Sequence, residues 1–234
     1  MTDTPVLNSV RRPAAAPPQV IADGRAVLRD PGAASLRRYL PVLAVIAAPY
    51  AAMGSGQDPL NPLDRVMEWD MMRAGLLDAA ARGSENAAPL ALVRLTPPTS
   101  QQLAEALSYD GPDAFRVVHF VCHGERDMLY LEDENGHESY AVAEHIANLF
   151  KPSGAHVVIL DGCFSEHMAR LLVDEAGVQA VIGTRRKVLP ANAQTFAAQF
   201  YAALAEGATI RRAYRGALAA LKQQENGQAD RFEL

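Results

Sequence analysis

The sequence predicts an α/β protein: a mainly parallel β-sheet covered by helices on both faces. From Pro41 onward, short apolar runs rich in β-branched residues alternate with longer amphipathic segments. Strands that are apolar on both faces are typical of a parallel sheet buried between two layers. Their alternation with helices implies βαβ units with right-handed crossovers, and therefore an α/β sandwich.

Five strands and six helices are expected in this sandwich. The strands are expected at Val42–Ala47, Leu90–Leu95, Phe115–Cys122, His156–Leu160 and Ala180–Gly183. The helices are expected at Leu63–Ala81, Ser100–Ser108, Val142–Phe150, Glu166–Glu175, Asn192–Ala205 and Thr209–Leu221.

Turn and cap residues mark several boundaries. Thr99 followed by Gln102 is a capping-box pattern before the second helix, and Gly207 stands where a C-cap is required. An Asn-Gly pair separates Met128–Glu132 from Ser139–Val142. Because Asn-Gly favours a tight hairpin turn, we expect a small antiparallel hairpin directly after the third strand.

Composition bounds the class of protein. The chain has 234 residues, with 22 Lys and Arg against 27 Asp and Glu, and 49% are hydrophobic. A chain of this length buries roughly 70% of its unfolded surface, enough for one domain. The net charge of −5 argues against direct nucleic-acid binding, which needs a concentrated basic face. Two cysteines cannot build a disulfide framework, and the longest apolar run, Pro41–Met53, is too short to span a bilayer. We expect a soluble, cytoplasmic protein with no membrane contact.

The two ends differ from the middle of the chain. Residues 1–38 are rich in Pro and Ala and lack periodicity, so we expect a disordered tail or linker, with Gln19–Leu28 as a possible short edge element. Residues 39–234 form the expected folded domain. The last residues, Arg231–Leu234, resemble the start of a further strand, so we expect the chain to be a piece of a longer, regulated protein.

Reactive side chains follow two of the predicted strands. The third strand ends at His123 and Gly124, and the fourth ends at Asp161, Gly162 and Cys163. In an open α/β sheet, ligands collect at the carboxyl ends of the strands. If these two strands are neighbours, an imidazole and a thiol face one crevice.

The chemistry of such a pair is nucleophilic. A free thiol has a pKa of about 8.5, so it is mostly protonated at neutral pH and needs a neighbouring base to form the nucleophilic thiolate. The N-terminus of a following helix also favours the thiolate. His123 can take the proton of Cys163, and the backbone N–H groups of Gly124 and Cys163 can bind the oxygen of a tetrahedral intermediate. The alternative, in which each residue is a structural core residue, weakens when both occupy glycine turns at successive strand ends.

These residues resemble a known family. The block Val117–Gly124 (VVHFVCHG) and the block Val157–Ser165 (VVILDGCFS) resemble the His-Gly and Asp-x-Cys-x-Ser blocks of caspase-like cysteine peptidases. The continuation is similar to their CHAT-domain branch, in the strand Ala180–Thr184, in the opening Val45–Pro49, and in the C-terminal helices through Phe196, Phe200, Tyr201, Leu204, Gly207, Ala213 and Ala217. The resemblance covers residues 40–234.

The resemblance implies a caspase–hemoglobinase fold and peptide-bond hydrolysis through an acyl-enzyme, with Cys163 as nucleophile and His123 as general base and acid. Many CHAT domains carry a small residue two positions before the cysteine, whereas Asp161 stands here, as in metacaspase-like and clostripain-like relatives. In those relatives the acid lies in the pocket for the side chain before the scissile bond, which implies a basic residue there. The alternative is that Asp161 caps the following turn.

A metal site and a phosphate loop are both weaker interpretations. A zinc ion needs three or four ligands that converge on one point, and the candidates are His119, Cys122, His123, Cys163 and His167. Cys122 points to the opposite face from His119 and His123, and His119 lies in mid-strand among apolar residues, which argues against such a site. Gly54–Gly56 lacks the Lys and Ser/Thr of a phosphate loop. We therefore expect no metal and no cofactor.

The sequence thus leads to a regulated cysteine endopeptidase of a bacterial-type signalling or defence pathway. Its expected partners are a protein or peptide substrate and a regulatory module or activating partner. Two alternatives remain: a catalytically silent CHAT-like scaffold that binds proteins through its sheet edge or crevice, and an α/β domain that binds a small ligand.

Overall fold

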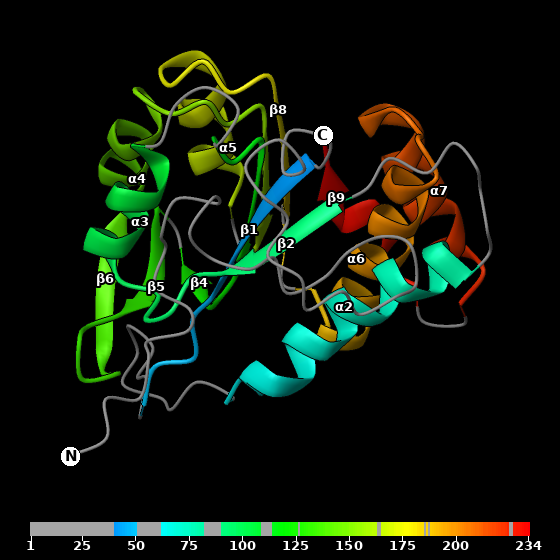
Figure 1. Cartoon of the computed structure of the whole chain (residues 1–234), viewed down its shortest axis with the longest axis horizontal. Helices are drawn as coiled ribbons and strands as arrows, with labels where there is room; N and C mark the ends of the chain where they lie inside the picture. The colour runs from blue at the N-terminus through cyan, green and yellow to red at the C-terminus, as the bar shows by residue number, and fades with distance from the viewer. Residues whose placement is uncertain are drawn as a thin grey trace, which may run out of the picture.

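A computed structural model describes residues 40–50, 62–81, 90–108, 114–125, 127–162, 165–184, 186, 188–224 and 227–234. Its centre is a six-stranded sheet with the order β2-β1-β3-β7-β8-β9 (Figure 1). The strands are β1 (Leu40–Ile46), β2 (Leu90–Arg94), β3 (Val117–Val121), β7 (Val157–Asp161), β8 (Ala180–Thr184) and β9 (Phe232–Glu233).

The first five of these strands are parallel, and only β9 is antiparallel to its neighbour β8. This arrangement confirms the predicted α/β class with a mainly parallel sheet. The expected strands all form, with ends displaced by at most two residues. The tail expected at residues 1–38 lies outside the described residues.

Helices cover both faces of the sheet, as Figure 1 shows. One face carries α3 (Ser100–Leu107), α4 (Ala143–Phe150) and α5 (Glu166–Asp174). The other carries α2 (Arg65–Ala81), α6 (Pro190–Ala205) and α7 (Ile210–Lys222).

Each face has its own apolar core, because alternate strand residues point to opposite sides. Along β3, Val117 and Val121 join the core under α2, α6 and α7, whereas Val118 and Phe120 join the core under α3, α4 and α5. The same alternation determines toward which face of the sheet the residues at the end of each strand point.

Local cap chemistry fixes the helix starts. Thr99 Oγ1 accepts a hydrogen bond from the Gln102 N–H at 3.1 Å, as the capping pattern predicted. The reciprocal half of the box does not form, since Gln102 Oε1 is buried with no hydrogen-bond partner. Helix α6 begins at Pro190, two residues earlier than predicted, because proline suits the first helical turn. Gly207 lies two residues after the last residue of α6 and has φ +82°, as expected of a glycine that terminates a helix.

The predicted hairpin forms the core of a second, smaller sheet. Strands β5 (Met128–Glu132) and β6 (Glu138–Val142) pair antiparallel around a turn in which Gly136 has φ +82°. The short β4 (Gly124–Glu125), which the sequence did not predict, pairs with β5 directly after β3. This sheet therefore holds the backbone that follows the end of β3. No helix within the described residues is long and apolar enough to cross a membrane.

Candidate active site

The predicted site residues follow two strands that are neighbours. Strands β3 and β7 pair in parallel register, with Val121 opposite Asp161. The backbone N–H of Cys122 donates to the carbonyl oxygen of Asp161 at 3.4 Å. The segments that follow the two strands therefore leave the sheet at the same edge, side by side.

Close backbone approach at this edge requires glycine. A Cβ placed on Gly162 would lie 3.2 Å from the carbonyl oxygen of Cys122 and 3.8 Å from the backbone nitrogen of Gly124. The first of these distances is tighter than ordinary van der Waals contact, so a larger residue at 162 would push the two segments apart. The structure thus brings together Gly124, one predicted oxyanion donor, and Gly162, the residue before Cys163.

His123 occupies the junction between the two sheets. It directly precedes β4, and its carbonyl oxygen accepts a hydrogen bond from the Tyr130 N–H at 3.0 Å. Its side chain is half-buried. Cys163, the predicted nucleophile, and Phe164 lie outside the described residues.

The residues on either side of Cys163 and Phe164 are anchored to β8. Thr184 Oγ1 donates to the carbonyl oxygen of Gly162 at 2.7 Å, and the Thr184 N–H donates to Ser165 Oγ at 2.9 Å. The Ser165 N–H in turn donates to the carbonyl oxygen of Thr184 at 3.1 Å. Ser165 and Thr184 are both buried. One residue at the end of β8 therefore holds both ends of the two-residue segment.

Asp161 ends β7 on the face covered by α2. Its predecessor on that face, Ile159, belongs to the core under α2, α6 and α7. Burial, and to a smaller extent the neighbouring charge of Glu68, raise the pKa of Asp161 to about 7. The carboxyl is thus poised to lose its proton near neutral pH, and an adjacent cation would favour that loss.

Glu68 is a buried acid that sequence reasoning missed. It lies on α2 with 6% exposure, and its Oε1 accepts a hydrogen bond from Gln194 Nε2 of α6 at 3.0 Å. Burial raises its pKa above the ordinary value. The signal for it was its position one helical turn before buried Met72, which places an acid on the apolar face of α2.

A second missed feature braces the carboxyl end of β1. Glu132 Oε1 accepts from the Ala48 N–H at 2.8 Å and lies 3.3 Å from Arg65 Nη2, which also donates to the Ala48 carbonyl oxygen at 2.8 Å. Glu132 is almost fully buried at the end of β5. This ion pair joins the small sheet, the end of β1 and the start of α2 around the same edge as the predicted site.

His119 of β3 and Cys122, the residue after β3, are buried on opposite faces of the sheet. His119 Nδ1 lies 2.9 Å from the Tyr201 hydroxyl, and burial lowers its pKa to about 3, so the ring is neutral. Cys122 is buried in the opposite core. Among the described residues, no group of three or more His, Cys, Asp or Glu could hold a metal ion.

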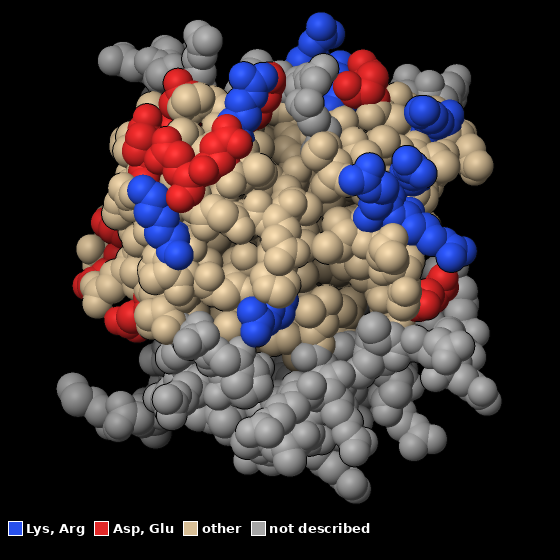
Figure 2. Space-filling view, turned by 90° about the horizontal axis from the view of Figure 1, so that it is seen from above, with Lys and Arg blue, Asp and Glu red and all other residues tan. Residues whose placement is uncertain are grey.

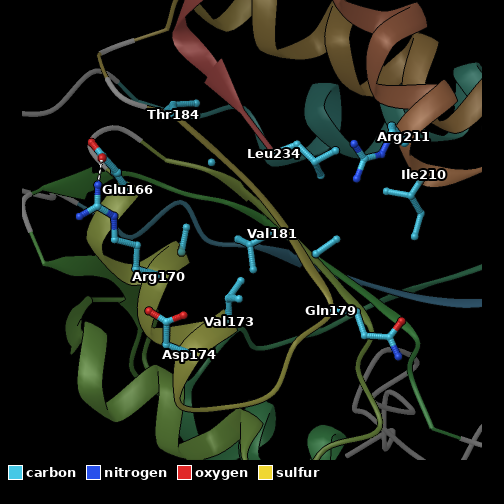
Figure 3. A pocket seen from close by; sticks show the side chains of 13 residues that line it. Glu166, Arg170, Val173, Asp174, Gln179, Val181, Thr184, Ile210, Arg211 and Leu234 are labelled. Atoms are coloured by element: carbon cyan, nitrogen blue, oxygen red, sulfur yellow. Dashed lines mark hydrogen bonds and ion pairs between the residues drawn. The ribbon is translucent and has the colours of Figure 1, made fainter.

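A groove of about 550 Å³ runs along the outer edge of β8. Its walls come from α5 and from the start of α7, and Figure 3 shows Glu166 and Thr184 at one end and Gln179 at the other. Strand β9 pairs with β8 only at Gly183 and Thr184. The sequence did not predict this groove.

Charged side chains are unevenly distributed over the face seen from above. In Figure 2, Asp and Glu gather on the left of this face, and Lys and Arg on the right, where α7 lies in Figure 1.

The fold is that of an α/β protein in which the segments predicted to carry His123 and Cys163 start next to each other, at the carboxyl ends of β3 and β7. The family model of the CHAT domain matches residues 24–232. The chain therefore belongs to the CHAT-domain family, as the resemblance of its motifs predicted, and this membership supports a cysteine peptidase.

Comparison with solved structures finds a secreted C11 cysteine protease from Bacteroides thetaiotaomicron, bound to an irreversible peptide inhibitor. The two are 10% identical with a TM-score of 0.45, and the match covers 82% of this chain. It covers 63% of that protease, so the chain spans less than two thirds of its length. The curated proteins contain no match to this chain.

Proposed function

We propose that this protein is a cysteine endopeptidase in which Cys163 is the nucleophile and His123 the general base and acid. The observation that carries the proposal is the pairing of β3 with β7, which starts the two motif segments next to each other. Close contact between Gly162 and the Cys122–Gly124 backbone supports it.

The proposed reaction has two stages. His123 accepts the thiol proton, the sulfur of Cys163 attacks the scissile carbonyl carbon, and the N–H groups of Gly124 and Cys163 stabilise the oxyanion. Collapse of the intermediate breaks the C–N bond, and His123 returns the proton to the leaving amine. Water, deprotonated by His123, then hydrolyses the thioester and releases the acid.

The proposed substrate carries a basic residue before the scissile bond. Asp161 supplies the carboxylate, and Glu68 lies near enough to influence its ionisation. A guanidinium can make two charge-assisted hydrogen bonds to a carboxylate, so Arg is preferred to Lys. An apolar side chain would leave the acid without a partner.

A thiol-directed covalent probe tests the proposed nucleophile. Stoichiometric labelling at Cys163, lost in Cys163→Ala and strongly slowed in His123→Ala, is expected. Cys122→Ala is the matched control, since Cys122 is buried in the core and should leave labelling unchanged. Labelling that is independent of His123 would contradict the dyad.

A fluorogenic peptide series that differs only in the residue before the scissile bond tests the substrate. Arg should exceed Leu by a hundredfold or more in kcat/KM, because an unpaired buried charge costs about 3–5 kcal/mol. Asp161→Ala should abolish this preference. A wild-type preference for Leu, or an unchanged preference in the variant, would overturn the pocket assignment even if the dyad stands.

We also propose that the peptidase is regulated, in a prokaryotic signalling or defence pathway, by a partner or a fused module. A catalytically silent scaffold is the second candidate, and the groove along β8 is the observation that favours it. The probe separates the two, since a scaffold needs no reactive thiol at position 163.

A further inference from the structure

The geometry points to a further role at the end of β8: we propose that Thr184 and Ser165 are positioning residues that orient the peptide unit between Gly162 and Cys163. This inference rests on the proposed function, because it concerns how the backbone N–H of the nucleophile is aimed at the oxyanion.

The contact that carries the inference is the hydrogen bond from Thr184 Oγ1 to the Gly162 carbonyl oxygen, at 2.7 Å. That oxygen belongs to the peptide unit whose nitrogen is that of Cys163. A peptide unit is planar, and in its trans form the N–H points opposite to the C=O. A hydroxyl that holds the Gly162 carbonyl would therefore also set the direction in which that N–H points, and this is the step that we infer.

Ser165 completes the arrangement from the other side. Two hydrogen bonds join its N–H and Oγ to the backbone of Thr184, at 3.1 and 2.9 Å. Thr184 is 2% exposed and Ser165 is 3% exposed, so water does not compete for these bonds. Thr184 and Glu166, the residue after Ser165, lie at the same end of the groove in Figure 3.

Space around Ser165 is also tight. A Cβ placed on Gly183 would lie 3.1 Å from Ser165 Oγ, so the strand residue before Thr184 must be small for this hydroxyl to keep its place. The four residues Gly162, Ser165, Gly183 and Thr184 thus form one fitted unit, which we call the β8 clamp. Its function is directional: it aims a donor, and it does not itself touch the substrate.

Two reactions of Cys163 in the full chain separate this role from a merely structural one. Acylation by p-nitrophenyl acetate forms a C–S bond, passes through an oxyanion and expels p-nitrophenolate. Alkylation by iodoacetamide forms a C–S bond and expels iodide with no oxyanion. A misdirected N–H slows only the first reaction.

We expect Thr184→Val, which removes the hydroxyl at nearly constant volume, to slow acylation of Cys163 by about 10- to 100-fold. Alkylation, read by mass spectrometry of the Cys163 peptide, should stay within about threefold of the wild type. Thr184→Ser should restore acylation. Thr195→Val is the matched control, since Thr195 Oγ1 also donates to a backbone carbonyl, that of Ala191, at a half-buried position of α6 away from the β8 clamp.

Equal changes in both reactions, or no change in acylation, would overturn the clamp. If Thr184→Val does not fold, Ser165→Ala decides by the same two rates, with slower acylation and unchanged alkylation expected. Acylation that persists in Cys163→Ala at the wild-type rate would refute the proposed function itself. If Thr184→Val is acylated at the wild-type rate while Cys163→Ala is not acylated, the positioning role of the β8 clamp is refuted and the proposed function stands.

Discussion

Replacing the carboxyl of Asp161 with an amide should stabilise the protein in a pH-dependent way. The native pKa of Asp161 is raised to about 7 by burial and by Glu68, while in the unfolded chain it returns to its ordinary value of 3.8. Between these values the native state holds one proton more than the unfolded state. The free energy of unfolding therefore falls as pH rises from about 4 to about 7, and the whole loss is present above pH 7.

The size of the effect follows from the two pKa values. Moving a carboxyl pKa from 3.8 to about 7 corresponds to at most about 4 kcal/mol. Because the side chain keeps some exposed surface, we expect about 1–3 kcal/mol. The Asp161→Asn variant carries no charge at this position at any pH. Its gain in stability over the wild type should therefore grow from near zero at about pH 4 to this value at about pH 8.

Urea denaturation followed by circular dichroism, at intervals between about pH 4 and pH 8, measures this difference. Titrating groups that do not interact with Asp161 occur in both proteins and cancel in the comparison. Asp230→Asn, at an exposed position, is the control and should give a flat difference. A flat or falling difference for Asp161→Asn, with unchanged m-values, would refute a partly buried carboxyl with a raised pKa at this site.

Three further predictions concern the neighbours of the site. Burial is the main cause of the raised pKa of Asp161, and Glu68→Gln removes the smaller contribution, that of the neighbouring charge. The midpoint of the pH-dependent stability loss should therefore move slightly to lower pH, and an unmoved midpoint in the same urea series would contradict the coupling of the two residues. Arg65→Met should destabilise the protein by about 1–3 kcal/mol, because it leaves buried Glu132 without its ion-pair partner. In a double-mutant cycle measured by thermal unfolding, Arg65→Met combined with Glu132→Gln should cost less stability than the sum of the two single changes. Burial lowers the pKa of His119 to about 3, against an ordinary value of 6.5 in the unfolded chain. The free energy of unfolding therefore falls as pH decreases from about 6.5 to about 3, because the unfolded histidine binds the extra proton. The His119→Gln variant should lose less stability than the wild type on acidification, and an equal loss in both proteins would exclude His119 as the cause.

Local sequence patterns were enough to predict most of the helices and strands and to suggest the chemistry that we propose for them. Apolar runs such as Val117–Val121 are buried on both faces, and this pattern specifies a covered parallel sheet. Turn and cap signals are equally local: Gly136 and Gly207 adopt the positive φ that their positions require. The motif blocks placed His123 and Cys163 at strand ends before any strand neighbour was known.

Which strand ends are neighbours, and what surrounds them, depended on the three-dimensional fold. The pairing of β3 with β7 joins residues about 40 positions apart, and no local pattern encodes that choice. The charge of Glu68, on α2, acts on the pKa of Asp161, and Thr184, on β8, donates a hydrogen bond to Gly162, both across a long separation in sequence. A side chain's pKa and a backbone carbonyl's donor depend on packing in three dimensions. For that reason the sequence predicted the reactive groups, while the groups that tune and orient them emerged only from the fold.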